Sequence, residues 1–480
     1  PQHHVAHIQL GDALLALNQP AAAVRAYRRA MELDDSADVR IALAEALLKS
    51  SSVEVDMLER LPVPYGLVRY GVAPDHPKLK LPAMAYARTA AMPGFRFVGG
   101  VTVGRDVSVS ELQDAYHAVV FCAGAETDRE LGIPGEELPG SYAATEFVGW
   151  YNGHPDYLQR NFDLTQERVV IVGHGNVAAD ICRILAKPVD ALRQTDIAEH
   201  ALEALSASRV REIHLIGRRG PVQAKFTDKE LRELGEIPQA CVSLDPGYLE
   251  LNPSSTAEAE DPRGQPAAWN MMLLREFAAR ATPIAQRRIR LRFLESPVAL
   301  YGGDRLEGVI LERNRLEGPP FGQRAHGSGD TLRLDCGLLF RSVGYKGVPI
   351  PGVPFDTLRG IIPNQQGRVI QGKSPLAGLY CAGWIKRGPS GIIGTNRADA
   401  VETATHLLSD FAERDCLPSK AGASTLLPLL SDRGLRCTDF QDWLKIDAAE
   451  IARGAAVGKP REKFVRVQDM FGAISDRAAV

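Results

Sequence analysis

A strand, a glycine-rich turn and a helix follow one another at residues 168–186, and this succession restricts the fold more than any other feature of the 480-residue chain. The apolar run VVIV ends at Val172, and the turn GHGNVA that follows has the form G-x-G-x-x-A before a helical pattern. Glycines at the first two positions allow a tight turn and a close approach of the backbone to a pyrophosphate, which the amide groups of the helix N-terminus attract. We therefore predict a dinucleotide site at Gly173 and Gly175.

Two arginines, rather than an acidic residue, follow the next predicted strand of this unit. The strand is VREIHLIG, and Arg218 and Arg219 come directly after it. An acidic residue would accept a hydrogen bond from the ribose 2′-hydroxyl of NAD, whereas guanidinium groups suit the 2′-phosphate of NADP. An exposed basic turn without a ligand is the alternative. Because the pair follows the second strand of the unit, we predict that the cofactor is NADP.

Strands alternate with helical patterns from residue 53 onward. VEVDMLE (53–59) indicates a strand ending in an acid, and HAVVFCAGA (117–125) indicates a buried strand. Residues 376–411 indicate a strand, a glycine loop and a long helix, while the polar, proline-rich run 245–266 indicates a surface loop. The alternation predicts an α/β fold with more than one doubly wound parallel sheet, and the length of the chain predicts two or three domains.

The first fifty residues have a different pattern. VAHIQLGDALLALN and PAAAVRAYRRAMELD resemble the helix pair of a tetratricopeptide repeat, and ADVRIALAEALLKS continues in the same register. So few repeats cannot bury their apolar faces alone. We expect either a packed helical appendage or a shortened array, and a module that binds a protein partner is the alternative.

Composition excludes several classes of function. A net charge of −3 argues against a nucleic-acid binder, and no apolar stretch reaches the length of a membrane span. The seven cysteines include no C-x-x-C pair, so neither a zinc site nor a redox dithiol is expected. A reducing, cytoplasmic compartment and a site without a metal fit this pattern best.

Six motifs, in the same order along the chain, resemble the adrenodoxin reductase family of ferredoxin–NADP reductases. They are MLERLPVPYGLVRYGVAPDHP (57–77), VVFCAGAETDRELGIPG (119–135), VGHGNVAAD (172–180), IGRRGPVQAKFTDKELREL (216–234), RSVGYKG (341–347) and AGWIKRGPSGIIGTN (382–396). The resemblance implies two Rossmann-like dinucleotide-binding domains on the FAD/NADP plan of glutathione reductase. Residues 51–125 and 343–480 would form the FAD domain, and residues 126–342 the inserted NADPH domain.

The resemblance also implies roles for individual residues. Glu59 would hold the adenosine ribose of FAD, with Leu67 and Val103 lining the adenosine side. The residues expected along the flavin ring are Trp384, Gly391, Ile392 and Ile393. Those expected to contact NADP are Arg129, Gly175, Asn176, Val177, Arg218, Arg219 and Glu230. His76 and Glu233 would be the catalytic pair close to the reacting rings.

The implied activity is that of a flavoprotein reductase. It would move a hydride from NADPH to FAD and then pass single electrons to a ferredoxin- or adrenodoxin-type iron–sulfur protein. Such partners are commonly acidic, so a basic docking face is expected. The run 287–292, RRIRLR, could contribute to that face, and it is equally well explained as an edge strand with a solvated side.

One departure from the family pattern leaves an alternative open. A G-x-G-x-x-G turn should seat the FAD diphosphate before Glu59, and the sequence has none there. The alternative is therefore an FAD-deficient, catalytically impaired NADP-binding remnant with a helical interaction segment. A flavin subunit of the glutamate-synthase type is a third possibility, which the motifs at 65–77 and 383–396 disfavour.

Overall fold

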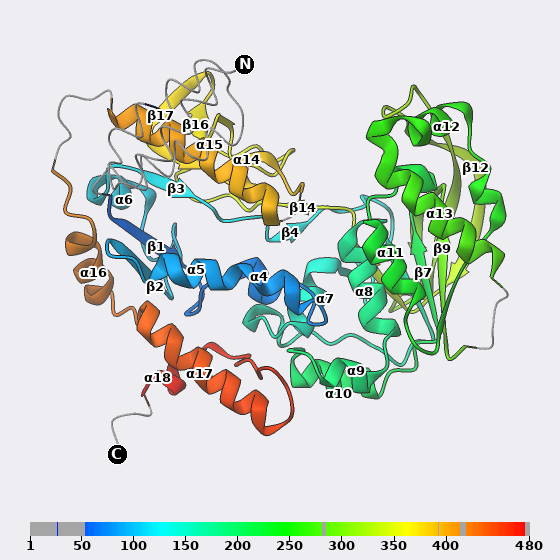
Figure 1. Cartoon of the computed structure of the whole chain (residues 1–480), viewed down its shortest axis with the longest axis horizontal. Coiled ribbons are helices and arrows are strands. Elements are labelled where there is room, and N and C mark those ends of the chain that lie inside the picture. Colours follow the sequence, from blue (N-terminus) through cyan, green and yellow to red (C-terminus); the bar gives the residue numbers. More distant parts are fainter. Residues whose placement is uncertain (1–25, 27–52, 281–284, 392, 413–418, 476–480) are drawn as a thin grey trace. The chain divides into compact units, whose positions relative to one another are not determined.

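The computed structural model describes residues 26, 53–280, 285–391, 393–412 and 419–475 (Figure 1). The prediction of tetratricopeptide-like helices at 1–50 lies outside the described residues. Contacts divide the chain into two units. The first comprises the described residues up to Pro64, Met84–Thr127 and Tyr345–Leu444, and the second comprises Tyr65–Ala83, Asp128–Gly344 and the described residues from Lys445.

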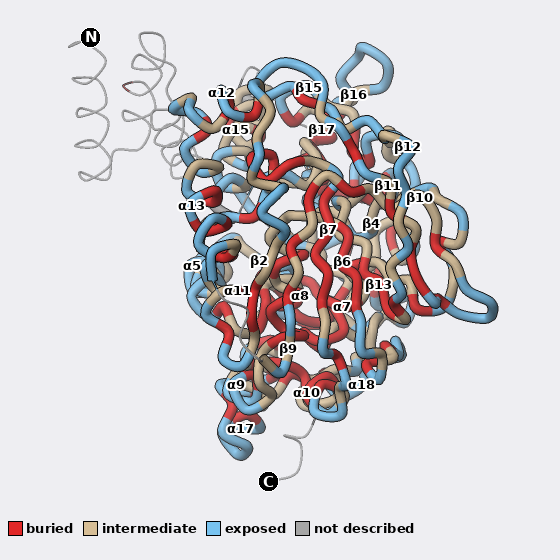
Figure 2. Tube along the Cα trace, turned by 90° about the vertical axis from the view of Figure 1, so that its right-hand side faces the viewer, coloured by how far each residue is buried: buried red, intermediate tan, exposed pale blue. Residues whose placement is uncertain are grey.

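The second unit is built on a six-stranded parallel sheet. Its strands, in spatial order, are β5 (Ser141–Ala143), β13 (Leu338–Arg341), β6 (Arg168–Val172), β7 (Glu212–Ile216), β9 (Arg287–Arg292) and β8 (Ala240–Leu244). Buried residues are concentrated along the central strands, as Figure 2 shows for β6 and β7. A parallel sheet needs both faces covered, and the continuous apolar run of β6 meets that requirement. The doubly wound α/β fold predicted here is confirmed.

Helices of the second unit cover the sheet and position the site. The longer ones are α7 (Ala144–Tyr151), α8 (Asn176–Ala186), α10 (Glu199–Ser206), α11 (Asp228–Gly235) and α13 (Gln265–Ala279), with short α4 (Gly66–Tyr70) and α9 (Val189–Arg193). Single 3₁₀ turns form η1 (Pro77–Lys80), η2 (Pro155–Tyr157) and η3 (Pro221–Gln223). Helix α8 packs on β6 and β7, and α11 packs on α8. An antiparallel sheet of β10 (Glu295–Tyr301), β11 (Gly308–Glu317) and β12 (Arg324–Asp335) completes the unit.

The predicted surface loop at 245–266 is wrong. This stretch contains η4 (Pro246–Leu249), α12 (Pro253–Glu260) and η5 (Pro262–Gly264), and α13 begins at Gln265. Asn252 caps α12, because its side chain accepts a hydrogen bond from the Ser255 amide at 2.7 Å. Proline is favoured in the first turn of a helix, where its missing amide hydrogen has no partner to lose. The prolines therefore start helices here.

The edge-strand explanation of the run 287–292 is also corrected. Strand β9 pairs with β7 on one side and β8 on the other, so it is not an edge strand. Arg290 forms an ion pair with Glu212, and Arg292 forms one with Glu295 at 2.7 Å. Arg287 donates to two backbone carbonyls at the end of α8. Arg288, in the same run, is exposed, so a contribution of this run to a basic docking face stays a prediction.

The first unit contains two separate sheets. Strands β1 (Val55–Glu59) and β2 (Phe95–Gly99) form a parallel pair, and β15 (Asn364–Gln365), β16 (Arg368–Gln371), β17 (Ser374–Cys381) and β3 (Val119–Phe121) form the other sheet. Its helices are α5 (Pro82–Ala90), α6 (Val109–Ala115), α14 (Trp384–Arg387), α15 (Ile393–Ala412) and α16 (Ala423–Asp432). Two-residue strands β4 (Thr127–Asp128) and β14 (Tyr345–Lys346) pair where the chain passes between units.

The strand predicted at 117–125 is shorter and less buried than expected. Only 119–121 is strand, and both Val120 and Cys122 are exposed. Leu58 of β1 and Val119 of β3 pack against the same apolar cluster, although β1 and β3 are not paired with each other. A strand that pairs on one side and has one uncovered face cannot bury its whole apolar run.

Segments 65–83 and 445–480 differ from the sequence-based division, which placed both in the FAD domain. Their described residues pack with the second unit, through α17 (Phe440–Ala456) and α18 (Val467–Ser475). The buried Arg69 and Glu450 form an ion pair between the two segments, and Lys463 bonds Asp196 before α10. Among the described residues, no helix is long and apolar enough to cross a membrane.

Candidate functional site

The glycine turn predicted from the sequence lies between β6 and α8. Gly173 has a φ of +132°, and a Cβ added there would lie 2.1 Å from the Ser342 carbonyl oxygen. Gly175 differs, since a Cβ on it would meet nothing within 4 Å. Ala178, at the sixth position of the motif, is fully buried against the sheet. The first glycine thus serves the turn, the second leaves open space beside the backbone, and the alanine allows close packing.

The N-terminus of α8 is suited to an anion. Its N-cap is Gly175, which has no side chain to accept hydrogen bonds from the first amides of the helix. Asn176 accepts a hydrogen bond from the Thr227 amide at 3.0 Å, so its side-chain oxygen is engaged with the start of α11. The side chain of Val177 packs against the main apolar core of the unit. The unpaired amides and the helix dipole are therefore left for a bound phosphate.

Arg218 and Arg219 form the turn after β7. The Arg218 carbonyl accepts from Asn314 at 2.8 Å, and the Arg219 carbonyl accepts from the Leu294 amide at 3.1 Å, so the backbone of the turn is fixed. Among the described residues, neither guanidinium forms an ion pair with a carboxylate. Burial, and then the neighbouring charge of Arg218, lowers the pKa of Arg219. Two adjacent cations without carboxylate partners favour a bound dianion.

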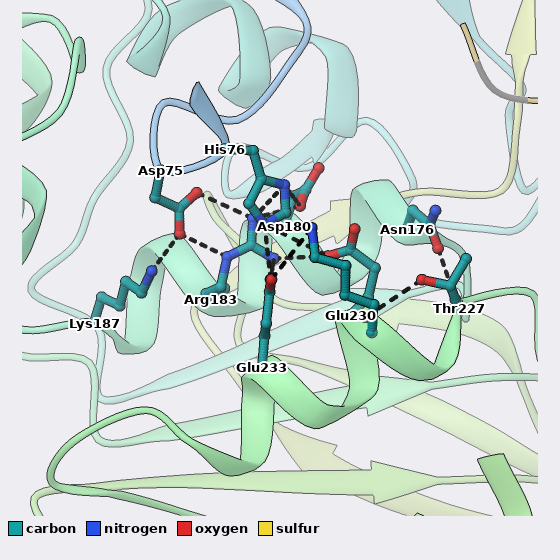
Figure 3. Close-up of polar contacts among 10 residues, drawn as sticks. Asp75, His76, Asn176, Asp180, Arg183, Lys187, Thr227, Glu230 and Glu233 are labelled. Atoms are coloured by element: carbon teal, nitrogen blue, oxygen red, sulfur yellow. Dashed lines mark hydrogen bonds and ion pairs between the residues drawn. The ribbon is translucent and has the colours of Figure 1, made fainter. Parts of the chain in front are cut away.

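The predicted pair His76 and Glu233 is in direct contact. His76 Nε2 lies 2.7 Å from Glu233 Oε2, although 157 positions separate the two residues. His76 precedes η1, and Glu233 lies on the last turn of α11 (Figure 3). The structure thus brings the two residues together; their catalytic role stays a prediction.

A buried arginine lies at the centre of this cluster. Arg183 of α8 is fully buried. It bonds Asp75 through Nε at 2.6 Å and a terminal nitrogen at 3.0 Å, and bonds Glu230 at 2.9 Å. It also bonds Asp180 at 2.6 Å. Glu230, predicted to contact NADP, is therefore engaged by Arg183.

The pKa values of the acidic residues in this cluster depend on the balance between burial and the neighbouring positive charges. Burial alone would raise the pKa of Asp75, but hydrogen bonds and charge from Arg183 and Lys187 hold it well below its usual range. Burial likewise opposes ionisation of Glu233, yet the hydrogen bond from His76 lowers its pKa. Burial raises the pKa of Asp180 to about 6, because Arg183 compensates only in part. Asp75 and Glu233 are thus held in their ionised forms, whereas the raised pKa brings Asp180 closest of the three to exchanging a proton near neutral pH.

The same cluster offers a possible set of metal ligands. His76, Glu230 and Glu233 each have one ligand atom within 4.8 Å of the others. The Arg183 guanidinium lies 2.9 Å from Glu230 and 3.6 Å from Glu233, so a metal cation there would adjoin a fixed positive charge. Like charges at this separation repel strongly in a buried site. The geometry therefore suits proton handling rather than metal binding.

The residues predicted to hold FAD lie mainly in the first unit. Glu59 ends β1, and its carboxylate accepts from the Leu61 amide at 3.2 Å. Burial raises the pKa of Glu59. Val103 packs beside two apolar clusters of this unit. Leu67, expected on the same side of the ligand as Val103, belongs instead to α4 of the second unit.

The glycine loop before α15 contains the remaining predicted FAD residues. Trp384 stacks on Tyr345 with ring centroids 5.6 Å apart, and its buried Nε1 has no hydrogen-bond partner among the described residues. Gly391 has a φ of +81°. The prediction for Ile392 lies outside the described residues, and Ile393 begins the 20-residue helix α15. An unpartnered indole N–H beside a glycine loop suits a polar ligand edge.

Arg129 is the last of the predicted NADP residues. Its amide donates to the Gly344 carbonyl at 2.8 Å, and its side chain lies over Gly344. Sequence reasoning missed Asp75, Asp180 and Arg183. A signal existed for Arg183, because it interrupts the apolar run ICRILA of α8, and a buried charge requires partners.

Comparisons with known proteins agree with this geometry. No protein-family model matches the chain. The chain is 46% identical over 442 residues to human NADPH:adrenodoxin oxidoreductase, mitochondrial, covering 89% of this chain and 88% of that protein. It is 43% identical over 441 residues to NADPH-ferredoxin reductase FprA of Mycobacterium tuberculosis, covering 89% and 95%. The solved structure of M. tuberculosis FprA in complex with NADPH matches with a TM-score of 0.83 and 42% identity, over 92% of this chain and 97% of that one.

Proposed function

This chain belongs to the family of NADPH:adrenodoxin oxidoreductases and NADPH-ferredoxin reductases, and we propose that it takes electrons from NADPH and delivers them to a small iron–sulfur protein. The observation that carries the proposal is the second unit's nucleotide site. An uncapped helix follows an open glycine turn, and two arginines without carboxylate partners follow the next strand.

In this proposal each part of the site binds one part of NADPH. The amides at the start of α8 hold the pyrophosphate, and the open space beside Gly175 lets the backbone approach it. Arg218 and Arg219 hold the 2′-phosphate. Glu230 and Arg129 contribute to binding the rest of the dinucleotide. The pair His76–Glu233 holds a proton at His76 Nε2 beside the nicotinamide.

The first unit supplies residues that fit FAD in part. Glu59 at the end of β1 suits a ribose hydroxyl, and the Trp384 Nε1, which has no hydrogen-bond partner among the described residues, suits the polar edge of a flavin. A bound flavin would accept a hydride and release electrons one at a time. The sequence ahead of β1 contains no G-x-G-x-x-G motif that could seat the diphosphate.

This partial fit favours one second candidate, an NADP-binding protein with weak affinity for FAD. In a doubly wound sheet the glycine turn follows a central strand, and the described strands β1 and β3 belong to separate sheets. Without the close approach of a glycine backbone, FAD would lose much of its diphosphate binding.

Spectroscopy of the purified full chain separates the two candidates. The protein is incubated with FAD and desalted, its visible absorption is recorded, and NADPH-dependent reduction of a ferredoxin is then measured. Retained flavin absorbance with acceptor reduction is the result expected of the reductase. A colourless protein that binds NADPH, measured by calorimetry, would instead establish the second candidate.

The relatives' names and the free cysteines suggest the electron acceptor and the cellular compartment of this protein. We propose a ferredoxin- or adrenodoxin-like acceptor, because the relatives' names specify adrenodoxin and ferredoxin. The six described cysteines are all free thiols, which fits a reducing, cytoplasm-like compartment, whereas the name of the human relative specifies mitochondria. Residues 1–50 remain a candidate segment for a further protein partner.

A further inference from the structure

Arg183 differs from an ordinary buried counter-ion in that it also faces the histidine ring. Its terminal nitrogen NH2 lies 3.4 Å from His76 Nδ1. The same nitrogen bonds Asp180 at 2.6 Å and Asp75 at 3.0 Å. The guanidinium therefore lies between the acidic residues and one edge of the imidazole (Figure 3).

This contact has a consequence for the proton on the ring. Arginine stays charged and can only donate hydrogen bonds. Both hydrogens of this nitrogen already have acceptors in Asp180 and Asp75, so its contact with His76 Nδ1 is electrostatic, and the positive charge favours a lone pair rather than an N–H on Nδ1. The single proton of the neutral ring is then on Nε2, from which it points to Glu233 Oε2 at 2.7 Å.

The other groups around the ring do not oppose this arrangement. Asp180 Oδ1 lies 3.9 Å from Nδ1, beyond hydrogen-bond reach, and it already accepts from Arg183. Glu230 Oε2 lies 4.0 Å from Nε2 and accepts from Arg183 at 2.9 Å. Asp75, the residue before His76, is bonded by both Arg183 and Lys187. Asp75, Asp180 and Glu230 thus accept short hydrogen bonds from cations, whereas the cations nearest Glu233, on Arg183 and Lys229, lie 3.6 Å from it.

We propose that Arg183 is a positioning residue that fixes His76 in its Nε2–H tautomer and so directs the ring proton to Glu233. It does so by placing its positive charge 3.4 Å from Nδ1 and by holding Asp75, the residue before His76. The functional meaning of this arrangement rests on the proposed role of the His76–Glu233 pair, whereas the tautomer itself does not.

The test is a series of long-range ¹H–¹⁵N correlation spectra of the full chain labelled with ¹⁵N-histidine, recorded at increasing pH, in which the tautomer is read from the neutral form of the ring. The His76 signals are assigned by their loss in His76→Gln. We expect the wild-type ring to be in the Nε2–H form. In Arg183→Lys, which keeps the charge but lacks the planar fork, we expect the Nδ1–H form to increase at least several-fold.

Lys187→Gln is the matched control, because it removes the other cation on Asp75 without touching His76. Its tautomer should equal that of the wild type. A wild-type ring in the Nδ1–H form overturns the proposal without any variant having to fold, and so does an unchanged tautomer in a folded Arg183→Lys protein. If the tautomer behaves as expected but His76→Gln transfers electrons at the wild-type rate, only the catalytic role of the pair fails.

Discussion

The Ser342 carbonyl oxygen lies 2.1 Å from the place where a Cβ on Gly173 would be. Strand β13 ends at Arg341, so this oxygen approaches the glycine turn from the neighbouring strand of the sheet. The first glycine of the turn is therefore required by packing within the protein, whereas Gly175 has open space beside it, which the proposed function assigns to the ligand.

This difference predicts opposite effects for two alanine substitutions. Gly175→Ala should fold with its stability changed by less than about 0.5 kcal/mol, yet bind NADPH at least tenfold more weakly. Gly173→Ala should lose roughly 2 kcal/mol of stability, because of the clash and the positive φ. Urea unfolding and calorimetric NADPH titration measure both. Equal loss of stability in the two variants would contradict this division.

Removing the arginine pair should change cofactor preference. Each of Arg218→Gln and Arg219→Gln is expected to weaken NADPH binding by about 10- to 100-fold, the usual value of a hydrogen bond to a charged group, and to leave NADH binding unchanged. Arg275→Gln, an exposed residue of α13, is the control for the lost charge. Equal losses for NADPH and NADH would refute the assignment to the 2′-phosphate.

A half-buried histidine in the glycine turn should make the second unit sensitive to acid. Burial lowers the pKa of His174 to about 4, and its Nε2 bonds the Leu215 carbonyl at 3.0 Å. The unfolded chain binds a proton there near pH 6.5 and the folded chain does not, so stability falls as pH falls from 6.5 toward 4. His174→Gln keeps a hydrogen-bond donor for the Leu215 carbonyl. Between pH 7.5 and 5.0 the free energy of unfolding of this variant should fall by about 2 kcal/mol less than that of the wild type.

Urea unfolding of wild type and His174→Gln at those two pH values checks this expectation. Part of the acid sensitivity should persist in His174→Gln, because burial also lowers the pKa of His214 to about 4. Identical pH dependence in the two proteins would show that His174 is not the titrating group.

The buried pair Arg69–Glu450 should dominate the attachment of the C-terminal segment. Glu450 is fully buried and accepts two bonds from Arg69, one from Arg461 and one from the Phe464 amide. Glu450→Gln leaves a buried guanidinium uncompensated and should cost about 3–5 kcal/mol. Glu276→Gln, which breaks an exposed pair with Arg280, should cost less than about 1 kcal/mol. Similar losses in the two variants, measured by urea unfolding, would contradict the buried pair's role.

Features that depend on neighbouring residues were predictable from the amino-acid order alone. The turn from Gly173 to Ala178 is local, because its glycine positions and the flanking strand and helix lie within about twenty residues. The pair Arg218–Arg219 follows a strand for the same reason. Local patterns failed at 245–266, where prolines and polar residues occupy helix N-termini as readily as loops.

Packing over long distances along the chain settled the rest. The sequence motifs suggested His76 and Glu233, but the arginine that joins them to Asp75 and Glu230 became visible only when α8, α11 and the segment before η1 came together. Burial is what makes these charges informative. A solvent-exposed arginine on a helix needs no partner, whereas a buried arginine needs several acidic partners to compensate for its lost hydration. The hydrophobic periodicity of the sequence does not predict which charged residue is buried or which residues surround it. The residues proposed to select the nucleotide were therefore predictable from local sequence, whereas those proposed to orient the proton are brought together only by the folded chain.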